Sequence, residues 1–513
     1  MIVIRRRAEF SALLLHILKI KFACIDIAKR VNYNIVYRNS LKEVFNMFIG
    51  REQELKKLNR MYESEKLEVA VIYGRRRVGK TTLINEFCKD KKTVFFAAQE
   101  NSIEQNLLEL SNSIAQVDKQ GSVANVMYRS FADALLRLEE LAKEERLVFV
   151  IDEYPYLAQA DKGISSLLQN FLDHQFKSTK LFLILCGSSM SFMENQVLGY
   201  QSPLYGRRTA QFKILPFDYF DTGKWFPEYS YEEKAIMYGV TGGIPMYLEQ
   251  FSPNMTLKEN LLENVFDKNA TLFEEPSNLL KQELREPATY NAVITAIASG
   301  KTKMSEIAST VGVETGLCTK YIANLITLGI IKREVPVMEP NSKRPIYLLD
   351  DQFFRFWYAF VPQNTSAIHS GRIEQSYETA IESRLSDYMG LVFERMCQDY
   401  IMYHDNKLPI YLGAVGQWWG GHPKTHKQAQ IDVVVTSADG NSGIVGSCKF
   451  KNKLVGEEEL LLLQDYAEAM GNFKQHYYYL FSKSGFTDTL KKGAEENVRL
   501  IALEDMYDNP LLE

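Results

Sequence analysis

The segment Gly74-Arg75-Arg76-Arg77-Val78-Gly79-Lys80-Thr81 decides the fold that this sequence predicts. It fits the pattern GxxxxGK[ST], whose glycines permit a tight loop. Residues 69–73, directly before it, are apolar and rich in β-branched side chains, which is typical of a buried strand. Residues 83–87, shortly after it, carry apolar side chains at helical spacing. The sequence therefore predicts a strand, a phosphate-binding loop and a helix, in that order.

Phosphate binding is the chemistry expected of this loop. Its backbone N–H groups and the N-terminus of the following helix favour a bound anion. Lys80 is expected to reach the β- and γ-phosphates, and the Thr81 hydroxyl is expected to bind Mg²⁺. Thr82 is counted with the same nucleotide-binding loop. The chain has no Asn-Lys-x-Asp run of the kind that guanine recognition normally needs, so ATP is the expected nucleotide.

Two further apolar runs end in polar residues that can complete the site. Residues 147–151 lead into Asp152 and Glu153. Asp152 is expected to hold Mg²⁺ through water, and Glu153 to orient or deprotonate the attacking water. Residues 180–186 lead into a polar tip at which Ser188 can contact the γ-phosphate or the lytic water. Together these runs predict an α/β fold, a P-loop NTPase with a parallel sheet.

Short motifs around these strands resemble a prokaryotic ATPase family of the AAA+-related STAND class, the "signal transduction ATPases with numerous domains". In chain order the motifs are Phe48-Ile49-Gly50-Arg51-Glu52, GRRRVGKT, VIDE, CGSS, PLYGRRT and TGGIP. The resemblance implies that Gly50 and Arg51 lie near the adenine. It also implies that Ser188 or Ser189 fills the sensor position.

The same resemblance gives roles to two later motifs. Arg207 or Arg208 of PLYGRRT is the candidate for a γ-phosphate-sensing or finger arginine, and Pro245 of TGGIP belongs to a helical lid that packs on the nucleotide. The alternatives are a solvated basic pair for the arginines and a helix-breaking turn for the lid motif. An arginine acting on a neighbouring chain would require an oligomer, whereas one acting within its own chain would need only a monomer.

The region after the ATPase core changes to short helices. Residues 290–325 are typical of three helices, and residues 328–335 of a strand entering a hairpin that returns near residues 345–348. This is the winged-helix arrangement, whose third helix would offer Thr319, Lys320 and Asn324 to DNA. The basic residues expected to place the wing against phosphates are Lys332, Arg333, Lys343 and Arg344. The alternative is an interdomain or protein-contact module, so DNA and a protein are both candidate partners.

The C-terminal region resembles the PD-(D/E)xK nuclease fold. Glu394 on a predicted helix, Asp432 on a predicted strand and Lys449 on the next strand fit that skeleton. In such a site carboxylates gather around Mg²⁺ and the lysine steers water at the scissile phosphate. However, Ser447 stands where the family has a glutamate, and Gln430 where relatives often carry an acid. Since fewer carboxylates weaken Mg²⁺ binding, we expect the nuclease fold with a degenerate site.

A chain of 513 residues exceeds what one hydrophobic core usually organises. We expect a P-loop ATPase core at residues 47–220, a helical lid at 221–285, a winged-helix domain at 286–350 and a nuclease-like domain at 351–513. Residues 1–46 are interpreted as an extension that is not native, because the recognisable motifs begin at Phe48.

Composition narrows the class of protein. The net charge of −4 gives no global attraction to nucleic acid, so any such contact must come from local patches. The six cysteines are scattered and are expected to be reduced thiols of a cytoplasmic protein. The sequence contains no run of 18 uncharged apolar residues, so we expect no membrane span.

The leading hypothesis is a protein that uses ATP binding and hydrolysis to switch the attached winged-helix and nuclease-like domains. One alternative is a DNA-processing nuclease regulated by ATP. Another is a regulatory protein that reports its nucleotide state to a partner without hydrolysis. ATP and Mg²⁺ are the expected cofactors in the first reading.

Overall fold

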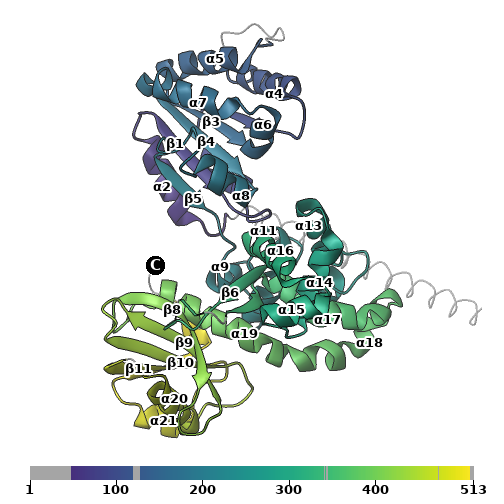
Figure 1. Ribbon diagram of the computed structural model, residues 1–513, viewed down its shortest axis with the longest axis vertical. Helices are drawn as coiled ribbons and strands as arrows, with labels where there is room; N and C mark the ends of the chain where they lie inside the picture. Colours follow the sequence, from purple (N-terminus) through teal and green to yellow (C-terminus); the bar gives the residue numbers. More distant parts are fainter. Residues whose placement is uncertain (1–47, 119–126, 340, 343–344, 472, 509–513) are drawn as a thin grey trace, which may run out of the picture.

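The computed structural model describes residues 48–118, 127–339, 341–342, 345–471 and 473–508. The expected extension at residues 1–46 and the expected wing residues Lys343 and Arg344 lie outside the described residues. Figure 1 shows three parts along the long axis: a first sheet with its helices, a helical middle, and a second sheet. No helix among the described residues is both long enough and apolar enough to cross a membrane.

The first sheet is parallel, and helices cover both of its faces (Figure 1). Its strands, in spatial order, are β2 (Thr93–Ala97), β3 (Leu147–Asp152), β4 (Leu181–Gly187), β1 (Glu68–Tyr73) and β5 (Ala210–Lys213). Every residue of β1, β3 and β4 is buried, as expected of central strands in a parallel sheet. The predicted α/β fold with a parallel sheet is therefore confirmed.

Alternate residues of the central strands feed two separate cores. Val69 and Val71 point to one face, and Ala70 and Ile72 to the other. The second face packs on α2 (Glu52–Tyr62) and α3 (Lys80–Cys88). The first face packs on α4 (Ile103–Ala115), α5 (Phe131–Glu144), α6 (Tyr154–Ala160) and α7 (Ile164–Asp173). Short helical segments after these elements are η1 (Phe176–Ser178), α8 (Met190–Phe192) and η2 (Met193–Val197).

A chain of helices and one hairpin forms the middle of the molecule. The first part comprises α9 (Tyr219–Lys224), α10 (Tyr231–Thr241), α11 (Pro245–Leu248), α12 (Leu257–Asn264) and α13 (Glu275–Glu283). Three helices and an antiparallel hairpin follow: α14 (Pro287–Ala298), α15 (Met304–Val311), α16 (Thr315–Thr327), β6 (Ile331–Glu334) and β7 (Ile346–Leu349). Helix α17 (Gln352–His369) begins with an aromatic-rich stretch and leads into α18 (Ile373–Tyr377), η3 (Glu378–Glu382), α19 (Ser383–Asp399) and η4 (Tyr400–His404).

The second sheet mixes antiparallel and parallel strands. In spatial order they are β12 (Val498–Ala502), β11 (Gln475–Ser482), β10 (Ser442–Lys449), β9 (Gln428–Ser437) and β8 (Leu412–Gly421). The pairs among β8, β9 and β10 are antiparallel, and those among β10, β11 and β12 are parallel. Helix α19 contacts the sheet at β9 and β10, and the remaining elements are α20 (Glu457–Met470), α21 (Asp488–Gly493) and η5 (Glu504–Met506).

One apolar core joins the helical middle to the second sheet. Its members extend from Phe217 to Met506, and Val433 and Ile444 of the sheet belong to it, whereas Val434 and Val445 belong to a separate core on the other face of that sheet. By contrast, the two cores of the first sheet contain no residue after Ile214. The connection from β5 into α9 is therefore the point at which the chain passes from one packed body to the other.

Gly243 is required by a close approach at this connection. Its φ is +66°, and an added Cβ would lie 1.9 Å from the carbonyl oxygen of Phe217. Gly312 has a similar φ of +76° but open space around it. We expect Gly243→Ala to lower the melting temperature more than Gly312→Ala, since the steric clash adds about 1–3 kcal/mol to the shared backbone strain. Equal melting temperatures for the two variants would contradict the close approach.

Candidate nucleotide site

The phosphate-binding loop lies where β1 ends and α3 begins, as the sequence predicts. Gly79 has a φ of +83° and is the N-cap of α3, a conformation that glycine adopts without a steric penalty. Gly74 has no room for a side chain, because an added Cβ would lie 2.3 Å from the carbonyl oxygen of Ile214. The two glycines of the motif thus serve a tight turn and a close approach to the chain after β5.

Lys80 is folded against its own loop. Its Nζ donates hydrogen bonds to the carbonyl oxygens of Gly74, at 3.0 Å, and Arg75, at 2.9 Å. The residue is only 6% exposed, and burial lowers the pKa of its ammonium group. Both bonds are made to neutral acceptors, so an anionic acceptor at the loop would compete for this lysine with a charge-assisted bond.

Thr81, Asp152, Glu153 and Ser188 converge at the carboxyl ends of three strands. The Thr81 hydroxyl donates to Asp152 Oδ2 at 2.9 Å, which joins the two expected magnesium ligands. Glu153 Oε2 accepts hydrogen bonds from the Ser188 backbone N–H, at 3.2 Å, and from its hydroxyl, at 2.9 Å. Strand β4 lies between β1 and β3, and this order places Ser188 beside the acidic pair.

The backbone of Glu153 is left-handed, with a φ of +50°. Such a conformation costs a non-glycine residue of order 1–3 kcal/mol and is found most often at functional sites. The hydrogen bonds from Ser188 hold the carboxylate in one orientation. Sequence reasoning proposed that Ser188 contacts phosphate or water; its contact with Glu153 is an additional one.

The lid and the residues before α2 approach the same loop. Met246, next to Pro245, donates its N–H to the carbonyl oxygen of Arg77 at 3.5 Å, and an added Cβ on Gly79 would lie 3.5 Å from the Pro245 ring. The guanidinium of Arg51 lies 4.6 Å from the ring centre of Phe217. Gly50 meets the same ring, because its added Cβ would lie 2.8 Å from Phe217 Cε1. The structure therefore brings the predicted Gly50, Arg51 and Pro245 to the edge of the sheet that carries the loop.

The three arginines of the loop contact carboxylates far along the chain. Arg75 pairs with Asp351 at 2.5 Å, and the side chain of Asp351 is fully buried. Arg76 Nε pairs with Glu283 at 2.6 Å. Sequence reasoning counted these arginines as nucleotide-binding residues and missed their acidic partners, because the partners lie in elements that only folding brings near.

Arg77 is the third arginine of this set. It forms an ion pair with Glu275, whose side chain is 3% exposed. The hydroxyl of Tyr247 donates a second bond to Glu275, at 2.8 Å. Together the three arginines connect the loop to α13 and to the N-terminus of α17.

Arg207 and Arg208 lie at the opposite edge of the sheet, which corrects the expectation that they sense phosphate within their own chain. They precede β5, whose Ala210 pairs with Ala70 near the start of β1 in a parallel register. The loop follows the other end of β1, about 20 Å away at the usual strand rise. Arg207 instead forms two bonds with Asp173, at 2.8 and 2.7 Å.

The nuclease-like residues lie together at the face between α19 and the second sheet. Glu394 accepts a hydrogen bond from Gln417 Nε2 at 2.7 Å, and Asp432 Oδ2 accepts one from the Cys448 N–H at 3.0 Å. Burial, followed by the charge of Asp432, raises the pKa of Glu394 to about 8. Burial also raises the pKa of Asp432. Two adjacent buried carboxyl groups disfavour each other's ionisation.

Glu459 belongs to the helix that packs on the other face of this sheet, and it is an acid that sequence reasoning missed. It lies in the first turn of α20, pairs with Lys449 at 3.0 Å and accepts a bond from the Ser447 hydroxyl at 2.7 Å. A carboxylate therefore contacts the serine that stands where the family has a glutamate. Across the described ranges, no group of three or more potential ligand side chains has the spacing needed to hold a metal ion.

The residues expected to contact DNA have mixed surroundings. Asn324 of α16 donates to the Tyr290 hydroxyl at 2.6 Å, so its amide is engaged within the three-helix unit. Lys320 on the same helix is exposed. The Thr319 hydroxyl donates to a carbonyl oxygen of its own helix, and Lys332 forms an ion pair with Glu334, two residues further along β6. Arg333 is exposed.

Comparisons with known proteins place the chain in a family. A model described as "ATPase domain predominantly from Archaea" matches residues 48–251, and one described as archaeal and bacterial proteins of unknown function matches residues 357–461. An uncharacterized protein of Methanocaldococcus jannaschii is 32% identical over 409 residues, which cover 79% of this chain and 88% of that protein. The chain belongs to this archaeal-type ATPase family.

Other proteins are similar to parts of the chain. An uncharacterized ATP-binding protein of M. jannaschii is 48% identical over 46 residues, which cover 9% of this chain and 78% of that protein. Among solved structures, a Walker-type ATPase of Pyrococcus abyssi is 20% identical with a TM-score of 0.49, covering 61% of this chain and 96% of that one. The ORC2 protein of Aeropyrum pernix is 13% identical with a TM-score of 0.42, covering 64% and 96%. This member of the family carries the archaeal-type ATPase domain over residues 48–251.

Lys80 offers a direct test of this site. We expect Lys80→Ala to weaken ATP binding about 10- to 100-fold, the usual effect of losing a charged hydrogen-bond donor. Lys89→Ala is the matched control, since Lys89 lies at the other end of the same helix and pairs with Glu86 on the surface. Equilibrium dialysis with labelled ATP measures both variants, and equal affinities would contradict the assignment.

Proposed function

We propose that this protein is an ATPase of the AAA+/STAND type that uses ATP binding and hydrolysis to switch its attached winged-helix and nuclease-like domains. In this proposal the loop from Gly74 to Thr82 binds the phosphates of ATP. Mg²⁺ is held by Thr81 directly and by Asp152 through water. The hydrogen bond between these two side chains supports the assignment, because two groups in direct contact are close enough to serve the same ion.

Glu153 is the proposed base of the hydrolytic step. Its carboxylate orients the attacking water or takes its proton, and Lys80 offsets the negative charge on the phosphates. Ser188 positions Glu153 through its two hydrogen bonds. If Arg207 or Arg208 contributes to hydrolysis, it does so on a neighbouring chain, because of its place at the far edge of the sheet.

The observation that carries the switch is the set of ion pairs made by Arg75, Arg76 and Arg77. Each of these neighbouring loop residues is paired with an acid of the helical body. Breaking a buried ion pair by removal of one partner costs about 3–5 kcal/mol. The Arg75 and Arg77 pairs are largely buried, so a change in the loop on phosphate binding that separated either one would leave a buried charge without its partner. That cost is large enough to shift the position of the body.

The wider proposal keeps the domain ranges expected from the sequence, with residues 286–350 as the winged helix and 351–513 as the nuclease-like domain. Three helices and a hairpin support the first, and the sheet with α19 on one face supports the second. DNA is the proposed partner of the winged helix through Lys320 and Arg333, and a protein is the other candidate. The cytoplasm is the proposed location.

Glu153→Gln tests hydrolysis separately from binding. We expect turnover of ATP to fall about 100- to 10,000-fold, the usual contribution of a general base, while ATP affinity is retained. Glu144→Gln is the control, because Glu144 is exposed near the end of α5. Phosphate release and equilibrium dialysis are measured on the same preparations. Equal turnover in wild type and Glu153→Gln would contradict the role of Glu153, and no turnover above background in either protein would support the regulator that does not hydrolyse ATP.

Asp351→Asn tests the coupling. Asp351 Oδ1 also caps α17 by accepting the Phe354 N–H at 3.0 Å, and asparagine caps a helix equally well, so the substitution removes the charge but keeps the cap. We expect ATP to change amide hydrogen exchange at the start of α17 in wild type and not in Asp351→Asn. Asp350→Asn, at the exposed neighbouring position, is the control. A wild-type response in Asp351→Asn would contradict the coupling.

A further inference from the structure

A cavity of about 760 Å³ lies where the first sheet meets the helical body and α19. Arg51 and Gly74 line the side near the phosphate-binding loop, and Glu394 and Gln417 line the side near the nuclease-like residues. The Arg75–Asp351 ion pair forms part of the wall between them. The volume falls within the range of about 300–1,000 Å³ that is usual for small-molecule sites, which often lie between domains.

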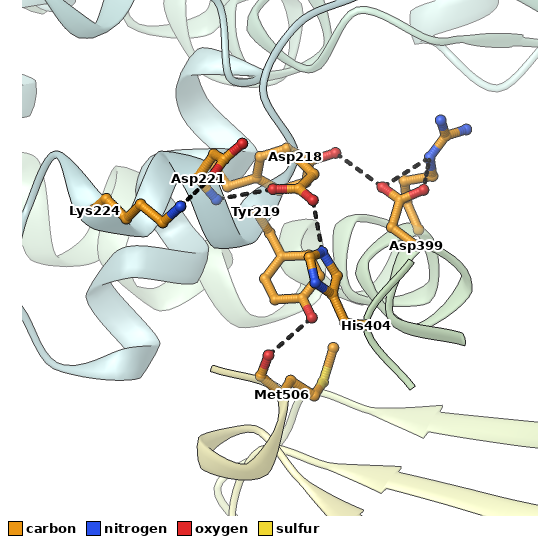
Figure 2. Close-up of polar contacts among 9 residues, drawn as sticks. Asp218, Tyr219, Asp221, Lys224, Asp399, His404 and Met506 are labelled. Carbon is orange, nitrogen blue, oxygen red and sulfur yellow. Dashed lines mark hydrogen bonds and ion pairs between the residues drawn. The ribbon is translucent and has the colours of Figure 1, made fainter. Parts of the chain in front are cut away.

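On one wall of the cavity, the charged side chains pair with one another. Figure 2 shows this wall, on which α9 faces η4 and the end of α19. Asp218 bonds to His404 Nε2 at 2.6 Å, and Asp221 pairs with Lys224 at 2.6 Å. Asp399 pairs with an arginine one helical turn before it on α19. Because these charged groups already pair with one another, this wall offers few unpaired groups to bind a ligand.

The opposite wall, from β6 and α17, holds polar atoms whose hydrogen bonds are not satisfied. Gln352 Oε1, Arg355 Nη1 and Glu334 Oε2 are buried and have no hydrogen-bond partner among the described residues. Gln352 is 7% exposed, and all three residues line the cavity. Arg355 makes no ion pair within the described part of the chain, although its Nη2 donates to the Leu349 carbonyl oxygen at 2.8 Å. A buried polar atom without a partner is costly, so such groups usually have one.

These three atoms define the chemistry of a complementary ligand. The Arg355 guanidinium requires an acceptor and favours an anionic oxygen such as that of a phosphate. The oxygens of Gln352 and Glu334 require N–H or O–H donors. The cavity also contains the rings of Phe220 and Tyr403, on which a base can stack. A nucleotide offers all of these features: phosphate oxygens, hydroxyl and amino donors, and a flat ring.

We propose that this cavity is a second binding site for a nucleotide, separate from the phosphate-binding loop, with Arg355 contacting its phosphate and Gln352 and Glu334 contacting its donors. The ligand is a free nucleotide or the terminal nucleotide of a nucleic acid strand, which share this chemistry. A ligand bound in this cavity would affect the ATP site through the Arg75–Asp351 ion pair, because both residues line the cavity. That regulatory consequence rests on the proposed function, whereas the binding itself does not.

The test measures nucleotide binding when the loop is disabled. Equilibrium dialysis with labelled ADP and with a 5′-phosphorylated hexathymidylate is carried out on Lys80→Ala and on Lys80→Ala combined with Arg355→Ala, Gln352→Leu or Arg384→Ala. Lys80→Ala is expected to retain one site for at least one probe, and the probe that binds identifies the source. Arg355→Ala is expected to weaken this site about 10- to 100-fold and Gln352→Leu about 2- to 10-fold. Arg384→Ala, an exposed arginine bonded to Gln363, is expected to leave it unchanged.

The outcomes distinguish this proposal from the proposed function. If Lys80→Ala binds neither probe, the second site does not exist. The same conclusion follows if the double variants with Arg355→Ala and Gln352→Leu have the melting temperature of Lys80→Ala and bind the probes as tightly as Lys80→Ala does. If wild type binds one ADP, which both Lys80→Ala and Arg355→Ala alone abolish, the cavity is only part of the loop's own site and the proposal is overturned. If Lys80→Ala binds as wild type does and Arg355→Ala alone removes all binding, the second site stands and the loop assignment fails.

Discussion

The ion pair between Arg75 and Asp351 is the contact on which the relation between the two packed bodies depends. It spans 276 positions of the chain and joins a loop at the edge of the first sheet to the N-terminus of α17. Both charges are largely removed from water, so each needs the other. Arg76 and Arg77 add two pairs to α13, so that three adjacent loop residues hold the helical body at two points.

The parts of the site that could be predicted from sequence are those set by local chemistry. Strands β1, β3 and β4 are buried along their whole length because both faces of a parallel sheet are covered. Strand β1 leads directly into the loop, whereas β3 and β4 lead into the polar residues Asp152 and Ser188. Parallel strands bring such ends to one edge. The hydrogen bond from Thr81 to Asp152 follows from this geometry, and so does the presence of Ser188 beside Glu153.

What could not be predicted depends on pairings between distant segments. The family resemblance of PLYGRRT implied a place near phosphate for Arg207 or Arg208, but the parallel pairing of β5 with β1 puts both at the other edge. The acids that receive Arg75 and Arg77 lie in unrelated stretches of sequence with no motif of their own. Glu459 likewise contacts Ser447 only because α20 packs beside β10. The spacing of the two residues in the sequence does not indicate this packing.

The shared core determines what a switch in this protein can move. Helices α9 and α10 are tied to the C-terminal part by polar contacts as well as by apolar packing. Asp218, the N-cap of α9, bonds to His404, and the Tyr219 hydroxyl donates to the Met506 carbonyl oxygen at 2.9 Å (Figure 2). The Tyr388 hydroxyl likewise donates to the Gly239 carbonyl oxygen of α10 at 2.6 Å. Helices joined in this way do not move independently of the C-terminal part. Under the proposed function, a force on the loop arginines would therefore be applied to the lid, the three-helix unit and the second sheet together, with the passage from β5 to α9 as the flexible joint.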